Sequence, residues 1–182
     1  LPEDHLLLEF VRYEPVNFRP KSMDDLELPA RYGCFVVDAG SVIAVDLGAA
    51  DAIDRTVESY HRLLSDQVDR NEVSVLSEKE LASLGRELYR LVLEPIEQKT
   101  DLARYRRPIV AGDGRLQLIP FEAFVEPSET TDTIRYLAEA LSVSYVNSGK
   151  ECVGWPNGPD NGLGEAVVVG DPDFDLVPEA VL

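Results

Sequence analysis

Three apolar runs near the start of the chain have the length and composition of β-strands. Residues 5–14 (HLLLEFVRYE) are rich in Leu, Phe, Val and Tyr, which favours a strand. The runs 32–37 and 42–47 are separated only by the turn residues 38–41 (DAGS), so they predict a hairpin. Residues 15–29 contain three prolines and an acidic patch, and they predict a loop.

A first amphipathic helix is predicted directly after Gly48, which should end the preceding strand. Within residues 49–64, apolar side chains recur at the spacing of one helix face, and they are Ile53, Val57, Tyr60, Leu63 and Leu64. Residues 65–76 are polar and interrupt this pattern, which predicts a connection between two helices.

A second helix is predicted from a new apolar face over residues 81–92. Ser77 and Glu80 have the spacing of a capping box, so Ser77 is the predicted N-cap. Pro95 should bend or end this helix, because proline lacks the backbone N–H group that the helix needs.

The segment 109–124 (IVAGDGRLQLIPFEAF) predicts a tight hairpin at Gly112-Asp113-Gly114. Both glycines can adopt positive φ, and the Asp113 side chain can bond its own backbone. The alternation after the turn places Leu116 and Leu118 on one face of a second strand, opposite Arg115 and Gln117. After Pro120, we expect a short helical turn in which Phe121 and Phe124 cover the core.

The remaining segments complete a mixed α/β pattern. Residues 132–141 predict a short helix and 143–146 a short strand, while the Gly- and Asn-rich residues 149–164 predict a loop. Ala166–Val169 (AVVV) has the composition of a strand buried in a parallel sheet. We therefore expect an α/β fold, a mixed sheet with antiparallel hairpins and flanking helices, in a single domain over residues 1–182.

The composition indicates which cellular environment and which partners to expect. The net charge of −17, from 34 acidic and 17 basic residues, repels nucleic acid and anionic membranes, so neither is an expected partner. No apolar run approaches the about 20 residues that span a bilayer, and no signal segment opens the sequence. The two cysteines, Cys34 and Cys152, do not form a disulfide framework, which fits the reducing cytoplasm.

The candidate reactive side chains do not form a recognisable catalytic or metal motif. His5 and His61 are the two histidines, and neither has a partner at the spacing of a zinc site. Cys34 lies in an apolar run, where its thiol should be inert. Sequence alone leaves open that Cys34 or Cys152 pairs with a histidine in a dyad, but we predict no catalytic residue in this chain.

The acidic end of the chain superficially suggests calcium. Asp171, Asp173 and Asp175 have the spacing that opens a calcium loop, but Leu176 replaces the required glycine and Leu182 the bidentate glutamate. We therefore predict no metal site and no cofactor. An unrelated small enzyme that uses surface carboxylates is the least favoured interpretation.

Six segments, in this order, resemble the front part of the CHAT domain, the caspase-like domain often associated with tetratricopeptide repeats. They are residues 32–37 (YGCFVV), 45–54 (VDLGAADAID), 88–96 (LYRLVLEPI), the Gly112–Gly114 turn with 119–124 (IPFEAF), 143–148 (VSYVNS) and 167–174 (VVVGDPDF). One departure is the turn itself, because the family usually has Pro-Asp-Gly where this chain has Gly112-Asp113-Gly114.

The resemblance implies a relationship to caspases and separases, cysteine peptidases with a His–Cys dyad. In that family the His-Gly and Ala-Cys motifs follow the Val-Gly-Asp-Pro segment, so the dyad is expected beyond residue 182. The chain would then be the non-catalytic scaffold, or pseudo-protease half, of the leading part of a CHAT domain. The alternative is a regulatory protein–protein interaction module that has no peptidase activity.

The resemblance also suggests partners. The first is the C-terminal catalytic half of the same protein, followed by upstream tetratricopeptide repeats or a regulatory protein. A strand at Ala166–Val169 would need neighbours on both sides. We therefore expect an exposed apolar edge near this end of the chain, covered by the catalytic half or by a second copy in a homodimer.

Overall fold

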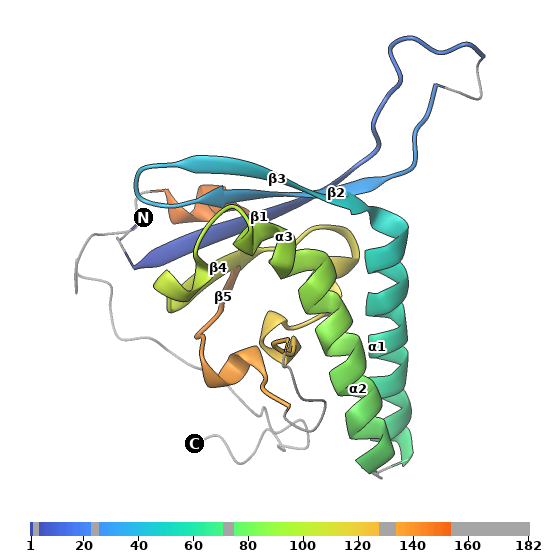
Figure 1. Ribbon diagram of the computed structural model, residues 1–182, viewed down its shortest axis with the longest axis vertical. Coiled ribbons are helices and arrows are strands. Elements are labelled where there is room, and N and C mark those ends of the chain that lie inside the picture. The colour runs from blue at the N-terminus through green and yellow to red at the C-terminus, as the bar shows by residue number, and fades with distance from the viewer. Residues whose placement is uncertain (2–3, 23–25, 71–74, 128–133, 154–182) are drawn as a thin grey trace, which may run out of the picture.

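The fold is built on a five-stranded sheet with the strand order β3-β2-β1-β4-β5 (Figure 1). A computed structural model describes residues 1, 4–22, 26–70, 75–127 and 134–153, and the side chains of 67–70 and 75–77 are not described. The strands are β1 (His5–Tyr13), β2 (Arg31–Val37), β3 (Val42–Ala49), β4 (Arg107–Ala111) and β5 (Ser144–Val146).

The sheet is mixed, as the sequence predicts. β2 pairs antiparallel with both β1 and β3, which confirms the hairpin around residues 38–41. β4 pairs parallel with both β1 and β5. The prediction that Gly48 ends β3 is wrong, because the strand continues to Ala49. Gly48 adopts φ +92° beside a register shift between Tyr32 and Gly33, so it accommodates an irregularity within the strand.

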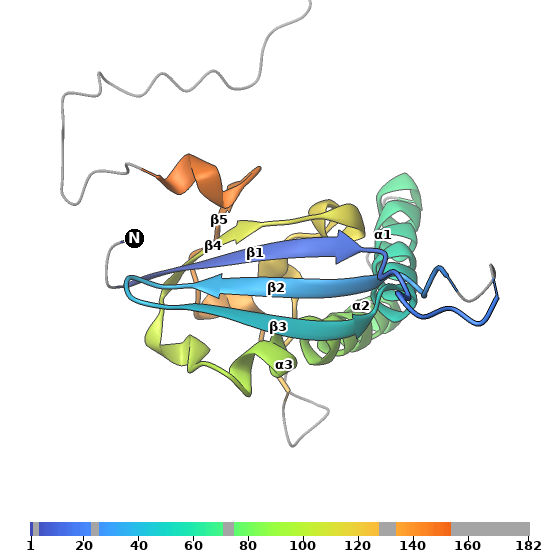
Figure 2. The same ribbon diagram turned by 90° about the horizontal axis from the view of Figure 1, so that it is seen from above.

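Two long helices lie on one side of the sheet, next to each other at the end where β3 leads into α1 (Figures 1 and 2). They are α1 (Ala50–Arg70) and α2 (Val75–Leu88). Apolar side chains that are almost fully buried join this helical layer to the sheet. The largest of these include Leu6, Tyr32, Ile53, Val57, Leu88 and Val92. Burial of the amphipathic stripe that the sequence shows therefore accounts for the position of α1.

The helix boundaries differ from those predicted. α1 extends to Arg70, past the predicted end at Leu64. α2 begins at Val75, so Ser77 lies inside the helix and is not its N-cap.

Helical structure does not end at Pro95 but continues to Glu97, and an unexpected conformation precedes the proline. Tyr89–Leu93 form a π-helix, in which the Glu94 N–H group bonds the Tyr89 carbonyl, and the short helix α3 (Glu94–Glu97) follows. Because proline removes an N–H group and crowds the preceding turn, the wider turn accommodates it.

The predicted hairpin at Gly112–Gly114 is wrong. Gly114–Leu118 form a 3₁₀-helix, with Leu116 only 1% exposed and Leu118 53% exposed, instead of a second strand with both leucines on one face. β4 already lies between β1 and β5, so no free edge remains for a returning strand. The predicted turn after Pro120 is confirmed at Phe121–Ala123.

The C-terminal part of the described chain agrees with the sequence in part. The strand predicted at 143–146 is confirmed as β5, and a 3₁₀-helix at Leu137–Glu139 is the helical part of 132–141. The predicted loop from residue 149 instead begins with a 3₁₀-helix, Gly149–Cys152. Ala166–Val169 and the acidic motif at 171–175 lie outside the described residues.

The close approach of α2 to residues 123–125 makes a testable prediction. A Cβ atom at Gly85 would lie 2.9 Å from the Ala123 carbonyl oxygen and 3.0 Å from Val125 Cγ2. Alanine favours helix by about 1 kcal/mol over glycine, but the clash should outweigh this gain. We expect Gly85→Ala to lower the free energy of unfolding by about 1–3 kcal/mol, measured by urea denaturation.

The control is Gly40→Ala, because an added Cβ atom at Gly40 meets nothing within 4 Å. We expect this variant to stay within about 0.5 kcal/mol of the original chain. A Gly85→Ala variant that is more stable than the original would contradict the packing described here.

Candidate functional site

The candidate site lies where the three parallel strands end. β1, β4 and β5 run in the same direction, so the segments that follow them leave from one edge of the sheet. In open α/β sheets, ligands bind at this edge, because the loops after the strands converge there. Two features occupy it, a buried polar network and an open groove.

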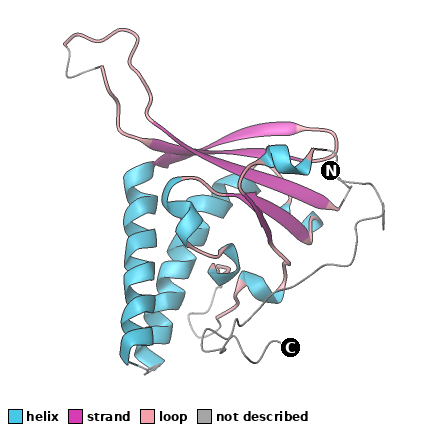
Figure 3. Ribbon diagram, turned by 180° about the vertical axis from the view of Figure 1, so that it is seen from behind, coloured by secondary structure: helices cyan, strands magenta, loops and turns pink. Residues whose placement is uncertain are grey.

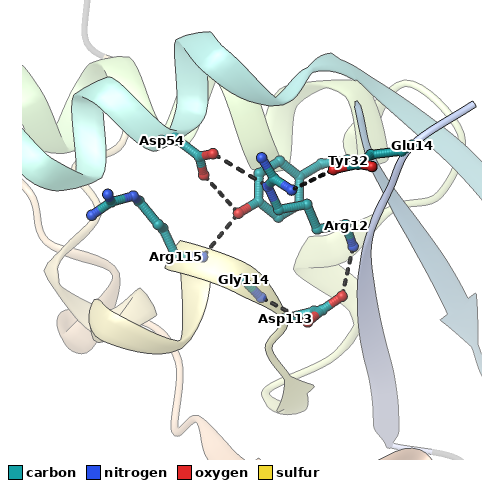
Figure 4. Close-up of polar contacts among 7 residues, drawn as sticks. All are labelled: Arg12, Glu14, Tyr32, Asp54, Asp113, Gly114 and Arg115. Carbon is teal, nitrogen blue, oxygen red and sulfur yellow. Dashed lines mark hydrogen bonds and ion pairs between the residues drawn. The ribbon is translucent and has the colours of Figure 1, made fainter. Parts of the chain in front are cut away.

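The network centres on the hydroxyl group of Tyr32, whose residue is completely buried on β2. This hydroxyl donates to Asp54 Oδ1 on α1 at 2.8 Å and accepts from the Arg115 N–H group at 2.9 Å (Figure 4). Asp54 Oδ2 also accepts from Arg12 Nε at 3.3 Å. One phenol therefore connects β2, helix α1 and the segment after β4.

A second bond joins β1 to the same segment. The Asp113 carboxylate accepts from the Arg12 N–H group at 2.7 Å and from the Gly114 N–H group at 2.7 Å. The expectation that Asp113 bonds its own backbone is thus confirmed. Its bond to β1 depends on a residue 101 positions away, which the local pattern could not indicate.

Gly114 is required at this junction for two reasons. Its φ of +56° lies in the left-handed region, which glycine adopts without strain. A Cβ atom here would also lie 2.5 Å from the Tyr32 hydroxyl oxygen and 2.8 Å from Arg12 Cδ. The lack of a side chain allows the backbone to approach the buried phenol.

The groove lies between the ends of β4 and β5 and has a volume of about 320 Å³. Its polar groups include Gly112, Gln117, Asn147 and Glu151. Gln117 Nε2 donates to the Gly112 carbonyl at 3.0 Å, and Asn147 Nδ2 donates to Glu151 Oε1 at 3.0 Å. These groups can bind a polar ligand, but none of the residues that line the groove is a thiol or an imidazole.

Tyr145 fixes the wall of this groove. Its hydroxyl donates to the Glu122 carboxylate and accepts from the Phe121 N–H group at 2.7 Å. Burial, together with the bond to the Glu122 carboxylate, raises the pKa of Tyr145. The phenol therefore stays protonated and connects β5 to the turn that follows Pro120.

The two thiols are both buried in apolar surroundings. Cys34 is 2% exposed in the main core, as the sequence predicts. Cys152 packs with Leu7, Ile109 and Ala111 on the sheet face opposite α1 and α2. Burial is the largest cause that raises the pKa of each thiol, and nearby carboxylates add to it. Both side chains are therefore held as neutral thiols, which are poor nucleophiles.

The two histidines lie apart from this edge. His5 begins β1, at the opposite end of the strand from Arg12, and its Nδ1 contacts Asp4 Oδ1 at 2.7 Å. His61 is exposed on α1. In the described part of the chain, no hydrogen bond joins a thiol to an imidazole, and no cluster of His, Cys, Asp and Glu could hold a metal ion.

Comparison with known proteins decides the family, because the family model of the CHAT domain matches residues 82–180. The chain belongs to the CHAT domain family. This confirms the resemblance, and the matched residues include the segments from Leu88 onward that carry it. The segments 32–37 and 45–54 lie before the match. No curated protein and no solved structure matches the chain significantly.

The matched and unmatched parts of the chain meet at the Tyr32 network. Asp113, Gly114 and Arg115 lie inside the residues that match the CHAT domain, whereas Arg12, Tyr32 and Asp54 precede them. Tyr32 on β2 is therefore bonded directly to the CHAT-matched loop after β4, and helix α1 is linked to that loop through Tyr32 and Arg12.

Tyr32→Phe tests the network. Loss of the hydroxyl leaves the Arg115 N–H group without its acceptor and removes a bond to Asp54. We therefore expect the free energy of unfolding to fall by about 1–3 kcal/mol, measured by urea denaturation. Tyr13, which is 40% exposed on β1 and interacts with the exposed Arg31 side chain, provides the control, and Tyr13→Phe should change stability by less than about 0.5 kcal/mol.

The stability lost in Tyr32→Phe should also depend on pH. Burial, followed by the bond to Asp54, raises the pKa of Tyr32 from 10.0 to about 12. The folded state therefore holds this proton more tightly, so the stability from the neutral phenol is complete below pH 10 and is lost between pH 10 and 12. The stability difference between the original chain and Tyr32→Phe should shrink over that range. A difference that is constant or grows would contradict the assignment.

Proposed function

We propose that this chain is the non-catalytic leading half of a caspase-like cysteine peptidase, with the His–Cys dyad beyond residue 182. The proposal rests on the burial and protonation of this chain's own thiols. A nucleophilic cysteine needs a thiolate and an adjacent base, whereas Cys34 and Cys152 are buried and have raised pKa values. Membership of the CHAT family supplies the reaction class.

In the complete protein, the reaction would be peptide hydrolysis. A thiolate outside this chain would attack the peptide carbonyl, a histidine would act as general base, and backbone N–H groups would stabilise the oxyanion. The part assigned to this chain is structural. The Tyr32 network fixes the edge where β1 and β4 end, so a catalytic half packed beside it would meet a preformed surface.

The edge of β5 is the proposed contact with that half. β5 has three residues, and in the part of the chain that the structure describes it pairs only with β4. An unpaired strand edge presents free N–H and C=O groups to an incoming strand. The proposed first partner is therefore the catalytic half of the same polypeptide, and upstream tetratricopeptide repeats are a further proposed partner.

The second candidate function is a regulatory interaction module without peptidase activity. The large number of exposed apolar side chains on β1–β3 and their connecting loop favours a binding role. In either case we place the protein in the cytoplasm, because its two cysteines are free. In a separate observation, none of the helices within the described residues has the length and apolar character needed to cross a bilayer.

The proposal is tested first on the coding sequence that follows Leu182 and then on the complete protein. We expect His-Gly and Ala-Cys motifs downstream, and alanine at that downstream cysteine should abolish cleavage of peptide substrates. The matched variant, Cys34→Ala with Cys152→Ala, should retain the cleavage rate. A stop codon directly after Leu182 would overturn the peptidase proposal in favour of the interaction module. Loss of activity in the matched variant, with folding intact by circular dichroism, would contradict the assignment of the nucleophile.

A further inference from the structure

One face of the sheet is partly open. Helices α1 and α2 lie on the other side of the sheet (Figures 1 and 3), and Figure 2 shows the open side, where no described element crosses β2 or β3. On this open face, Tyr13, Phe35 and Val42 are 40%, 45% and 66% exposed, and the strand register places all three on the same side as Leu7. Exposed apolar residues gathered in this way mark a contact surface.

A groove of about 430 Å³ lies within this open region, and we call it the sheet groove. Small residues, Gly33 and Ala44, leave space in it between larger neighbours on β1 and β2. The Asp46 carboxylate also lines the groove and pairs with Arg31, so this end of the groove carries no net charge. An uncharged, apolar group is therefore the best occupant.

The chain reaches the open face just before the described residues end. The Gly149 N–H group bonds Glu9 Oε1 at 3.2 Å, and Cys152 packs on Leu7. Both of these β1 residues alternate with the core residues and face the same side as the sheet groove. Val153, the next residue, is 81% exposed. The segment that follows therefore starts beside the uncovered part of the sheet.

Trp155, which lies just outside the described residues, can reach the groove. Phe35 lies on the strand next to Leu7, two residues from the partner of Leu7, which places it about 8 Å away on the same face. The three residues from Cys152 to Trp155 can span about 10 Å. Trp155 is also the only tryptophan in the chain, and the next large apolar residue after it is Leu163.

We propose that Trp155 occupies the sheet groove, so that the segment after Val153 crosses the open face from β1 to β2 and β3. Residue 155 lies inside the part that matches the CHAT domain, whereas β2 and β3 precede it. The contact would join these two parts on the face opposite the Tyr32 network. The inference goes beyond the proposed peptidase role and holds with or without a catalytic half.

The chemistry of the groove suits an indole. The indole N–H group is a donor only, and it usually has a partner when tryptophan is buried. Asp46 accepts two bonds from Arg31 and one from the Gly48 N–H group. Because a carboxylate can accept about four hydrogen bonds, Asp46 can also accept from the indole of Trp155.

A side chain of the same molecule is favoured over an external occupant. A group held on a short linker has an effective concentration on the order of millimolar, and Trp155 follows the described chain by only two residues. A second copy has no such advantage, and the net charge of −17 opposes its approach. An acidic partner is opposed for the same reason.

Tryptophan fluorescence of the 182-residue chain tests the proposal, because Trp155 is its only source of this signal. In the native chain, we expect emission at a shorter wavelength than in the urea-unfolded chain. Quenching by acrylamide should be several-fold weaker than for free N-acetyltryptophanamide. Both properties should stay unchanged on dilution, because the groove and the tryptophan belong to one molecule.

Two variants of the groove locate the tryptophan. Ala44→Glu places a charge at an exposed position in the groove. Gly33→Val fills the groove without a charge, and its Cβ atom would lie 3.5 Å from the Val45 carbonyl oxygen, an ordinary contact. Each variant should shift the emission to longer wavelength and strengthen quenching. The matched control, Leu118→Glu, alters an exposed residue outside the groove and should change neither property.

Three results would overturn the proposal. The first is a native chain whose emission and quenching equal those of the unfolded chain, which would leave Trp155 in solvent. The second is a protected tryptophan that neither groove variant exposes, although both fold normally by circular dichroism. The third is protection that disappears on dilution, which would assign the groove to the tryptophan of another molecule. Each result is independent of peptidase activity.

Discussion

The buried hydroxyl group of Tyr32 is the constraint on which the candidate site depends. A buried phenol must have hydrogen-bond partners, because an unsatisfied polar group costs about 1–3 kcal/mol. Tyr32 meets this requirement through Asp54 on α1 and the Arg115 N–H group after β4. The N-terminal hairpin, the first helix and the CHAT-matched loop are thereby held in one arrangement, and Gly114 allows the close approach that these bonds require.

In this arrangement, the residues that support the structure are different from the groups that could react. The edge where the parallel strands end is fixed by paired polar groups, and the groove beside it contains amide and carboxylate groups. The sulfur atoms, in contrast, lie in apolar surroundings, and burial raises their pKa values. A preformed edge without an activated thiol suits the proposed role of a platform beside a catalytic half.

The sequence predicted the elements whose patterns are local. Alternating and continuous apolar runs located β1, β2, β3 and β5, and helical spacing located α1 and α2, because each element buries one face regardless of its distant neighbours. The 3₁₀-helix at Gly114–Leu118 was missed because its leucines alternate like a strand, whereas the central position of β4 leaves no edge for one. Of the site, Asp113 was predicted in part. Tyr32 and Asp54 were missed because the bonds span 22 to 83 residues and leave no periodic signal.

The most direct measurement is hydrogen exchange at single amide groups in the native chain. The Arg12 N–H group donates to Asp113, and the Arg115 N–H group donates to Tyr32. If the network holds this edge in one arrangement, both amides should exchange as slowly as those of the core strands, and the Arg115 amide should lose its protection in Tyr32→Phe. Exchange of both amides at the rate of an exposed loop in the original chain would contradict the account.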